Sequence, residues 1–232
     1  MDVTTIGILG AGQAGSTLAQ ALVTVGYDVV LANSRSPRTL EPLVRALGPR
    51  ARAAWAADAA AAADLAVTAF PYRPDDELPA AELVGKVVVD TNNYMAWRDG
   101  TCPDVEAGRV TVHELRQRRL PTSRVAAAFT HVQFHPRSPL RVPSDAVPAL
   151  VRLSRPAGVP DRKALVVASD HPDAVRAVAE LYDALGYDAV GLTPLSESWR
   201  VGPGTPAWNA SFDGQTRDEL VRNLDRARRA VR

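Results

Sequence analysis

The chain has 232 residues, of which 46% are hydrophobic, and a formal net charge of +1. A near-neutral chain of this composition is not expected to be a dedicated nucleic-acid or anionic-membrane binder, so we expect neither kind of partner. The single cysteine, Cys102, excludes an internal disulfide framework. We find neither a basic-then-apolar leader nor an uncharged apolar run of spanning length, and we expect a cytoplasmic protein.

The opening segment predicts a nucleotide-binding turn. An apolar β-type run over 5–9 leads into Gly10-x-Gly12-x-x-Gly15 and then into a helix over 17–25. In this motif the first glycine makes the tight turn, the second lets backbone approach a pyrophosphate, and the third lets the helix pack on the strand. The helix N-terminus offers free N–H groups to that phosphate. A second strand over 28–32 favours a dinucleotide site over the alternative, a glycine-rich turn.

The end of that second strand indicates which dinucleotide binds. An NAD site usually has an acidic residue there, which binds the ribose 2′-OH. Here Asn33, Ser34 and Arg35 follow the strand, without an acid. A hydroxyl and a guanidinium suit a 2′-phosphate, which arginine can hold in a bidentate fork. We therefore expect NADP(H); the alternative is that Arg35 and Arg38 are only solvated loop charges.

Strand and helix signals alternate along the rest of the chain. We expect a helix over 38–47, a strand over 52–55, a helix over 56–64, a strand over 65–70, a helix over 75–83, a strand over 86–90, a helix over 111–120 and a strand over 124–129. Beyond these we expect loop with a short helix over 135–160, a strand over 164–168, a helix over 172–185, a strand over 187–192, irregular chain over 193–213 and a helix over 214–231. The order predicts an α/β fold with a Rossmann-type doubly wound, mostly parallel sheet. We expect an NADP-binding Rossmann domain over 1–134 and a smaller C-terminal part over 135–232 that completes the cleft.

Ligands of open α/β sheets lie beyond the carboxyl ends of the strands. The residues there, besides the glycine motif, are Ala69, Phe70 and Pro71, then Asn92, Asn93 and Tyr94, then Phe129, Thr130 and His131. We expect the two asparagines near the nicotinamide, although asparagine is also favoured in turns. His131 and His135 are the histidines expected near the cleft. His131 and Tyr94 are the candidate proton donors; the alternative for His131 is packing or backbone hydrogen bonding.

The sequence contains no HExxH, CxxC or paired-carboxylate pattern, so we expect no metal site. It also lacks a GxSxG elbow and a P-loop, which disfavours hydrolysis and phosphoryl transfer. The reaction class that remains is redox chemistry carried out by a bound cofactor.

Several separated segments together resemble the coenzyme F420-dependent NADP oxidoreductases. They are the glycine motif over 10–15, Asn33-Ser34-Arg35, and the stretches over 89–92, 125–129, 167–170 and 191–200. The resemblance implies that NADPH and the deazaflavin stack face to face in a narrow cleft. It implies that Ser34 and Arg35 hold the 2′-phosphate and that 69–71 contact the ribose.

The same resemblance assigns the remaining cofactor contacts. Gly12 and Gln13 would hold the pyrophosphate, with Ala14 beside them at the start of the helix, and the segment 128–133, beginning Ala128-Phe129-Thr130, would wall the deazaflavin. Thr130 departs from the family pattern, which often has asparagine there, and a long proline-rich insert over 135–148 follows. Both changes fall where the second substrate is expected.

Three functions remain open from the sequence. The leading one is hydride transfer between NADP(H) and the deazaflavin coenzyme F420. The first alternative is an NADPH-dependent reductase of a small carbonyl or imine, with His131 or Tyr94 donating the proton. The second is a non-catalytic NADPH-binding module. The terminal helix also suggests a homodimer, the commonest soluble oligomer.

Overall fold

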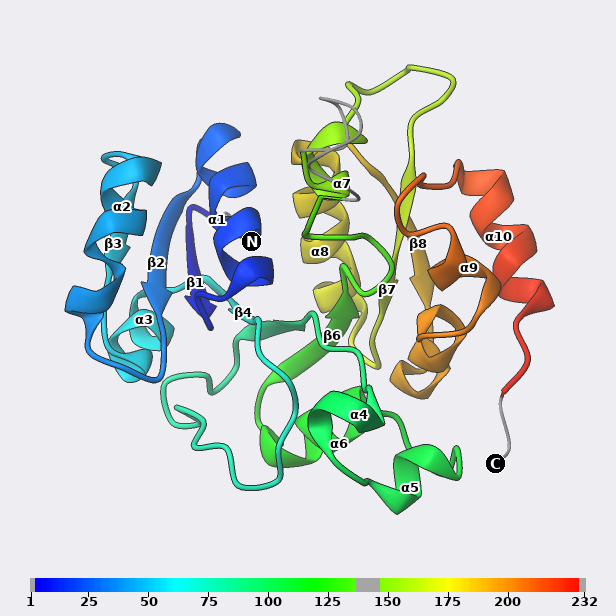
Figure 1. Ribbon diagram of the computed structural model, residues 1–232, viewed down its shortest axis with the longest axis horizontal. Coiled ribbons are helices and arrows are strands. Elements are labelled where there is room, and N and C mark those ends of the chain that lie inside the picture. Colours follow the sequence, from blue (N-terminus) through cyan, green and yellow to red (C-terminus); the bar gives the residue numbers. More distant parts are fainter. Residues whose placement is uncertain (1–2, 137–146, 230–232) are drawn as a thin grey trace.

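The computed structural model describes residues 3–136 and 147–229, and its core is one eight-stranded sheet in the order β3-β2-β1-β4-β5-β6-β7-β8 (Figure 1). The strands are β1 Thr5–Leu9, β2 Asp28–Ala32, β3 Ala51–Ala53, β4 Leu65–Thr68, β5 Val87–Asp90, β6 Arg124–Ala128, β7 Ala164–Ala168 and β8 Asp188–Leu192. Neighbouring strands are parallel except β6 and β7, which are antiparallel. The expected α/β fold with a doubly wound, mostly parallel sheet is confirmed.

Helices cover both faces of the sheet, which leaves the central strands buried. The α-helices are α1 Gln13–Thr24, α2 Glu41–Leu47, α3 Ala56–Ala62, α4 Ala96–Asp99, α5 Pro103–Glu106, α6 Val112–Arg119, α7 Ala149–Arg152, α8 Pro172–Ala184, α9 Pro206–Asn209 and α10 Arg217–Arg226, and two 3₁₀ helices are η1 Pro37–Leu40 and η3 Leu195–Val201. Every residue of β5, which reads Val-Val-Val-Asp, is buried, as is typical of parallel strands covered on both faces. Within the described ranges, no helix combines the length and hydropathy needed to cross a bilayer.

The turn between β1 and α1 depends on its glycines. Gly10 has a φ of +106°, a conformation that side chains disfavour, and its N–H donates to Ala32 O at 2.9 Å. A Cβ on Gly15 would lie 1.9 Å from Gly10 O, so only glycine allows α1 to start this close to the turn. The turn is thereby held against the carboxyl end of β2, next to Asn33.

The end of β6 is held by α8. Phe129 is buried with a φ of 59°, which is uncommon for a residue other than glycine. Its N–H donates to the hydroxyl of Tyr182 at 2.8 Å, and that hydroxyl donates to Val166 O at 2.8 Å. The two rings meet edge to face with centroids 4.8 Å apart. This contact ends β6 and directs the chain after it toward the carboxyl edge of the sheet.

The first half of the chain lacks one expected helix and contains two short helices that were not expected. The helix expected over 75–83 is wrong: the segment forms turns, with Leu83 N–H donating to Pro79 O at 3.2 Å. Pro74 and Pro79 lack backbone donors, and Pro79 would interrupt any helix through this stretch. The short helices α4 and α5, between β5 and α6, were not expected.

The second half also differs in its details. The segment expected to be irregular over 193–213 contains η3 and α9, and the terminal helix is shorter than expected because Ala227 already has extended backbone. The short helix expected within 135–160 is α7, and residues 137–146 lie outside the described ranges. β7 continues the sheet by pairing with β6 through Ala127↔Ala168 and Ala128↔Val167. The domain division at residue 134 stays a prediction, since both parts contribute strands to one sheet.

Candidate functional site

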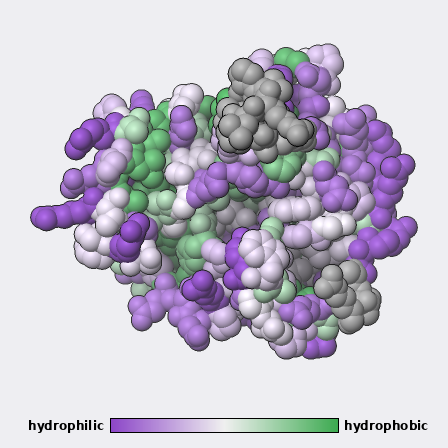
Figure 2. All heavy atoms as spheres, in the orientation of Figure 1, coloured by the Kyte–Doolittle hydropathy of each residue, from purple (hydrophilic) through white to green (hydrophobic). Residues whose placement is uncertain are grey.

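A cavity of about 440 Å³ lies at the carboxyl ends of β1, β4 and β5, and we call it the nucleotide cleft. It is lined by Gln13, Ala14, Ala69, Phe70, Pro71, Thr91, Asn92, Asn93, Met95, Trp97, Arg98, Val132, Gln133, Phe134, His135 and Trp208. Figure 2 shows a band of hydrophobic side chains over the amino-terminal elements on this side of the molecule. The structure therefore brings together the start of α1 with the loops after β4 and β5, as expected. It also places His135 in the cleft, as expected.

The start of α1 is open toward the cleft. Gly12 is the N-cap, and no side chain caps the helix there. No acidic residue lies in its first turn, and no atom lies within 4 Å of where a Cβ on Gly12 would stand. A helix N-terminus with free N–H groups and open space is suited to an anionic group. These features are what the glycine motif predicts for a pyrophosphate site.

The loop after β2 presents Ser34 and Arg35 to solvent. Asn33 organises this loop rather than facing a ligand: its Oδ1 accepts from Arg35 N–H at 2.9 Å and its Nδ2 donates to Thr39 Oγ1 at 2.9 Å. Among the described residues, no carboxylate forms an ion pair with Arg35. The Ser34 hydroxyl and the Arg35 guanidinium are thus available at the edge of the sheet where an adenosine ribose is expected.

The far side of the cleft is formed by residues 132–135, which overlap only the end of the expected segment 128–133. Ala128, Phe129 and Thr130 are buried and do not line the cavity. The chain that follows them is anchored to α1, where the Thr17 hydroxyl donates to Phe134 O at 2.9 Å. Phe134 and, from α9, Trp208 both line the cleft.

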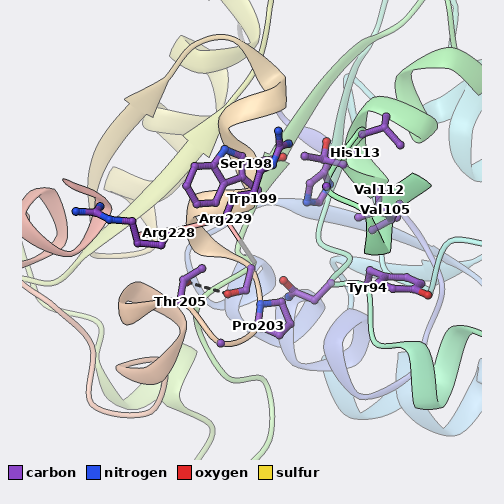
Figure 3. A pocket seen from close by; sticks show the side chains of 16 residues that line it. Tyr94, Val105, Val112, His113, Ser198, Trp199, Pro203, Thr205, Arg228 and Arg229 are labelled. Carbon is purple, nitrogen blue, oxygen red and sulfur yellow. Dashed lines mark hydrogen bonds between the residues drawn. The ribbon is translucent and has the colours of Figure 1, made fainter. Parts of the chain in front are cut away.

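Neither candidate proton donor lies in the nucleotide cleft. His131 is 2% exposed, and its Nε2 accepts from Val166 N–H at 2.9 Å. Tyr94 lies in a neighbouring cavity (Figure 3), where its hydroxyl bonds to Glu106 Oε1 at 2.5 Å and to Gly100 O at 2.7 Å. Burial and the hydrogen bond to Glu106 raise the pKa of Tyr94 to about 12. The burial of His131 and its backbone hydrogen bond agree with its alternative interpretation, packing or backbone hydrogen bonding.

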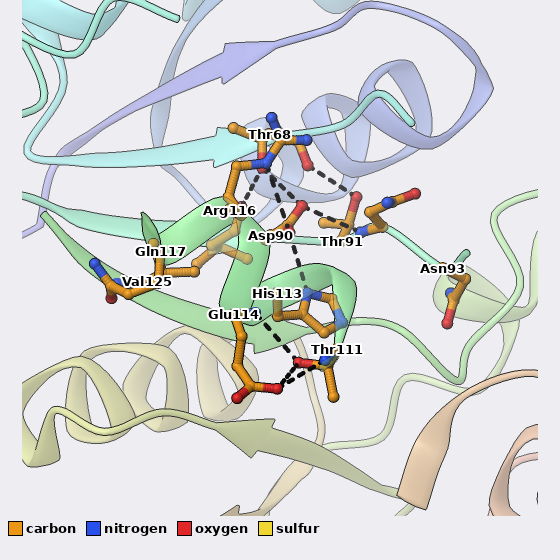
Figure 4. A network of polar contacts seen from close by, with 12 residues as sticks. Thr68, Asp90, Thr91, Asn93, Thr111, His113, Glu114, Arg116, Gln117 and Val125 are labelled. Carbon is orange, nitrogen blue, oxygen red and sulfur yellow. Dashed lines mark hydrogen bonds and ion pairs between the residues drawn. The ribbon is translucent and has the colours of Figure 1, made fainter. Parts of the chain in front are cut away.

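A buried polar network lies behind the cleft (Figure 4). Asp90, at the end of β5, accepts from Thr68 Oγ1 at 2.9 Å and bonds to His113 Nδ1 at 3.1 Å, and Arg116 Nε lies 3.7 Å from its carboxylate. Burial alone would raise the pKa of Asp90, but the charge of Arg116 and the hydrogen bonds from His113 and Thr68 outweigh it and lower the pKa. The network ties the ends of β4 and β5 to α6.

The guanidinium of Arg116 connects this network to the wall of the cleft. It is fully buried and lies over the rings of Phe70, at 4.8 Å from the centroid, and Tyr72, at 5.3 Å. A cation over an aromatic face is attractive, so Arg116 orients the ring of Phe70 that lines the cleft. Arg116 was not among the expected site residues, since nothing in the sequence of its helix marks it as buried.

Two asparagines after β5 line the cleft, and they differ in the hydrogen bonding of their side-chain amide nitrogens. The Nδ2 of Asn93 is engaged, donating to Thr130 O at 2.7 Å. The Oδ1 of Asn92 accepts from Arg98 at 3.2 Å, while its buried Nδ2 has no partner in the described part of the chain. An unpaired buried donor costs free energy that a ligand acceptor can recover. Asn92 is therefore the side chain in the cleft best placed to donate to a ligand.

Comparison with known proteins relates the amino-terminal part to a family. Residues 5–94 match the model of the family described as NADP oxidoreductase, coenzyme F420-dependent. The YjhV protein of Escherichia coli (strain K12) is 39% identical over 70 residues, which are 30% of this chain and 51% of that protein. The chain thus spans about half the length of this curated relative.

Two solved structures share most of the fold. The hypothetical protein SMa0349 of Sinorhizobium meliloti superposes with a TM-score of 0.67 at 28% identity, covering 88% of this chain and 92% of that chain. A protein of Arthrobacter sp. FB24, provisionally named an F420-dependent NADP reductase, has a TM-score of 0.62 at 24% identity, covering 82% of this chain and 84% of that chain. At that identity the second likeness shows the fold alone. The family match confirms the resemblance that the sequence motifs predict: residues 5–94 of the chain are similar to the coenzyme F420-dependent NADP oxidoreductases, and the expected activity of the whole protein, that of an NADP-dependent oxidoreductase, stays a prediction.

Proposed function

We propose that this protein transfers a hydride between NADP(H), bound in the nucleotide cleft, and the deazaflavin coenzyme F420. The observation that carries the proposal is the amide of Asn92. It lies at the carboxyl end of β5, is 5% exposed and has an Nδ2 without a partner among the described residues. A nicotinamide carboxamide has an acceptor oxygen that can take this hydrogen bond. The uncapped start of α1 supports a pyrophosphate in the same cleft.

The preference for NADP(H) over NAD(H) follows from the loop after β2. A 2′-phosphate placed there would meet the hydroxyl of Ser34 and the guanidinium of Arg35, both exposed. A charge-assisted bidentate contact of this kind contributes about 1.5–3 kcal/mol, or about 10–150-fold in affinity. An NAD ribose offers no such charge to Arg35.

The lining of the cleft supports a planar hydride acceptor. Phe70, Met95, Trp97, Phe134 and Trp208 present apolar surface that can lie against flat rings. Hydride transfer between two aligned rings requires positioning rather than a side-chain nucleophile, and positioning can contribute about 7–11 kcal/mol. The absence of His131 and Tyr94 from the cleft lining is compatible with this chemistry.

A spectroscopic assay tests the reaction. Enzyme, NADPH and oxidised coenzyme F420 are mixed, and the loss of the visible absorbance of the deazaflavin is followed. We expect turnover, and we expect Asn92→Leu, which removes the amide donor, to weaken NADPH binding by about tenfold. NADPH that binds without any turnover of F420 would overturn the deazaflavin assignment. Turnover of a small carbonyl or imine would then support the first alternative, and failure with every acceptor would support a binding module.

A second experiment tests the nucleotide preference. In Ser34→Asp with Arg35→Ala, an acidic residue replaces the phosphate contacts, and we expect the preference for NADPH over NADH to fall by about tenfold or more. The matched control is Arg38→Ala, an exposed arginine in η1 three residues further along, which we expect to leave the preference unchanged. An unchanged ratio of NADPH affinity to NADH affinity in the double variant would contradict the assignment of Ser34 and Arg35 to the 2′-phosphate.

A homodimer stays part of the proposal, and light scattering at micromolar concentration measures the oligomeric state.

A further inference from the structure

A second cavity, of about 330 Å³, lies beside the nucleotide cleft (Figure 3). One wall comes from the segment that contains α5 and the start of α6, and the other from η3 and the turn that follows it. Arg228 and Arg229, which follow α10, line one side of this second cavity. Asn93 lines both cavities, so the two are neighbours. We call this second cavity the arginine pocket.

The arginine pocket has a positive lining. Its lining residues include Arg228 and Arg229 and no aspartate or glutamate. Both arginines are exposed, and in the described part of the chain neither forms an ion pair. The guanidinium of Arg229 lies 5.6 Å from the ring centroid of Trp199. Two unneutralised cations over one cavity favour an anionic occupant.

The floor of the arginine pocket supplies uncharged donors. Thr111 caps α6, and the carboxylate of Glu114 accepts from the N–H of Thr111 at 2.7 Å. The next two N–H groups, of Val112 and His113, have no acceptor among the described residues. Both residues line the pocket, at the positive end of the helix dipole. A helix N-terminus of this kind is an anion site when a second group supports it.

Ser198 is that second group. It comes from η3, on the opposite wall, and is 2% exposed. Its Oγ is buried and has no hydrogen-bond partner in the described ranges. A buried hydroxyl without a partner is rare and costs free energy, which a ligand oxygen could recover. The first residues of α6, Ser198 and the two arginines thus line one cavity.

We propose that the arginine pocket binds a small organic anion, with its phosphate or carboxylate held by Arg228, Arg229, the first turn of α6 and Ser198. The apolar part of that ligand would lie against Val105, Pro203 and Trp199, which also line the pocket. This site goes beyond the proposed function, because the nucleotide and the reacting rings are expected in the neighbouring cleft. It gives the protein a second small-molecule site adjoining the first at Asn93.

Calorimetric titration with phenyl phosphate tests the proposal, because this probe combines the anionic group with an apolar ring. We expect saturable binding to the wild-type protein. We expect Arg228→Gln with Arg229→Gln to weaken it by about tenfold or more, and Ser198→Ala to weaken it by about threefold or more. Phenol, which lacks the charge, is expected to bind far more weakly.

Two matched variants assign the binding to this pocket. Arg226→Gln removes an exposed positive charge from the end of α10, outside the pocket, and is expected to leave the affinity within about twofold. Arg35→Gln removes the cation expected to hold the nucleotide 2′-phosphate and is likewise expected to have no effect. The proposal is overturned if the wild-type protein shows no saturable binding, if Arg35→Gln rather than the double variant abolishes it, or if phenol binds as tightly as phenyl phosphate.

Discussion

His131 makes the stability of this protein depend on pH in a defined window. Its imidazole is buried just after the end of β6, and its Nε2 accepts from Val166 N–H of β7 at 2.9 Å. Burial lowers the pKa of His131 from 6.5 to about 4. A protonated imidazole has no acceptor nitrogen, so protonation would also break this hydrogen bond.

The magnitude follows from the difference between the two pKa values. Between pH 6.5 and about 4 the unfolded chain binds a proton that the folded protein excludes. The free energy of unfolding therefore falls as the pH decreases through this window, and the contribution is fully present above it. The complete shift corresponds to about 3 kcal/mol, of which about 2 kcal/mol is lost between about pH 7 and pH 5.

Urea unfolding at about pH 7, 6 and 5 measures this loss, with His131→Gln as the test variant. The glutamine side chain offers an acceptor oxygen to Val166 N–H but does not titrate. We expect the wild-type protein to lose about 2 kcal/mol more than the variant between the highest and lowest pH. The control is His171→Gln, a partly exposed histidine before α8, which we expect to follow the wild-type profile. Parallel profiles for wild type and His131→Gln, or an NMR titration in which His131 protonates near pH 6.5 in the folded protein, would refute the reasoning.

Three further substitutions test the network and the glycine turn. Asp90→Asn removes the counter-charge of the fully buried Arg116 and is expected to cost about 3–5 kcal/mol, which lowers Tm by about 6–20 °C. Gly15→Ala would place a Cβ 1.9 Å from Gly10 O, so we expect a lower Tm and weaker NADPH binding together. Gly12→Ala, at an ordinary φ of −74° with open space around it, should keep Tm and weaken NADPH binding alone, by calorimetry.

These outcomes have their own controls. Asp104→Asn removes the carboxylate of an exposed ion pair with Arg109 and should change Tm little, because solvated pairs contribute little. If Asp104→Asn lowered Tm as much as Asp90→Asn, the stabilising role assigned to the buried pair of Asp90 and Arg116 would be contradicted. An unchanged NADPH affinity in Gly12→Ala would show that the pyrophosphate does not approach that glycine.

Local sequence patterns are enough to specify the alternating strands and helices and the residues that gather at the carboxyl ends of the strands. The glycine motif and the apolar runs are such patterns, and parallel strands bring their carboxyl ends to one edge of the sheet whatever their order. That is why the amino-acid sequence assigns Gln13, Ala69 to Pro71 and Asn92 to one cleft. The helix expected over 75–83 does not form for a local reason, the proline at position 79 inside it.

The packing of whole elements decides which side chains face the cleft and which are buried behind it. Of the expected wall segment 128–133, residues 132 and 133 line the cleft and 128–130 do not, because α8 holds Phe129 in an unusual conformation at the end of β6. His131 is buried because β7 runs antiparallel beside β6 and offers it the N–H of Val166, 35 residues away. The pairing of Asp90 with Arg116 and the assembly of the arginine pocket likewise join segments far apart in the chain. Such contacts leave no periodicity or spacing in the sequence, because each depends on how distant segments meet in the folded protein.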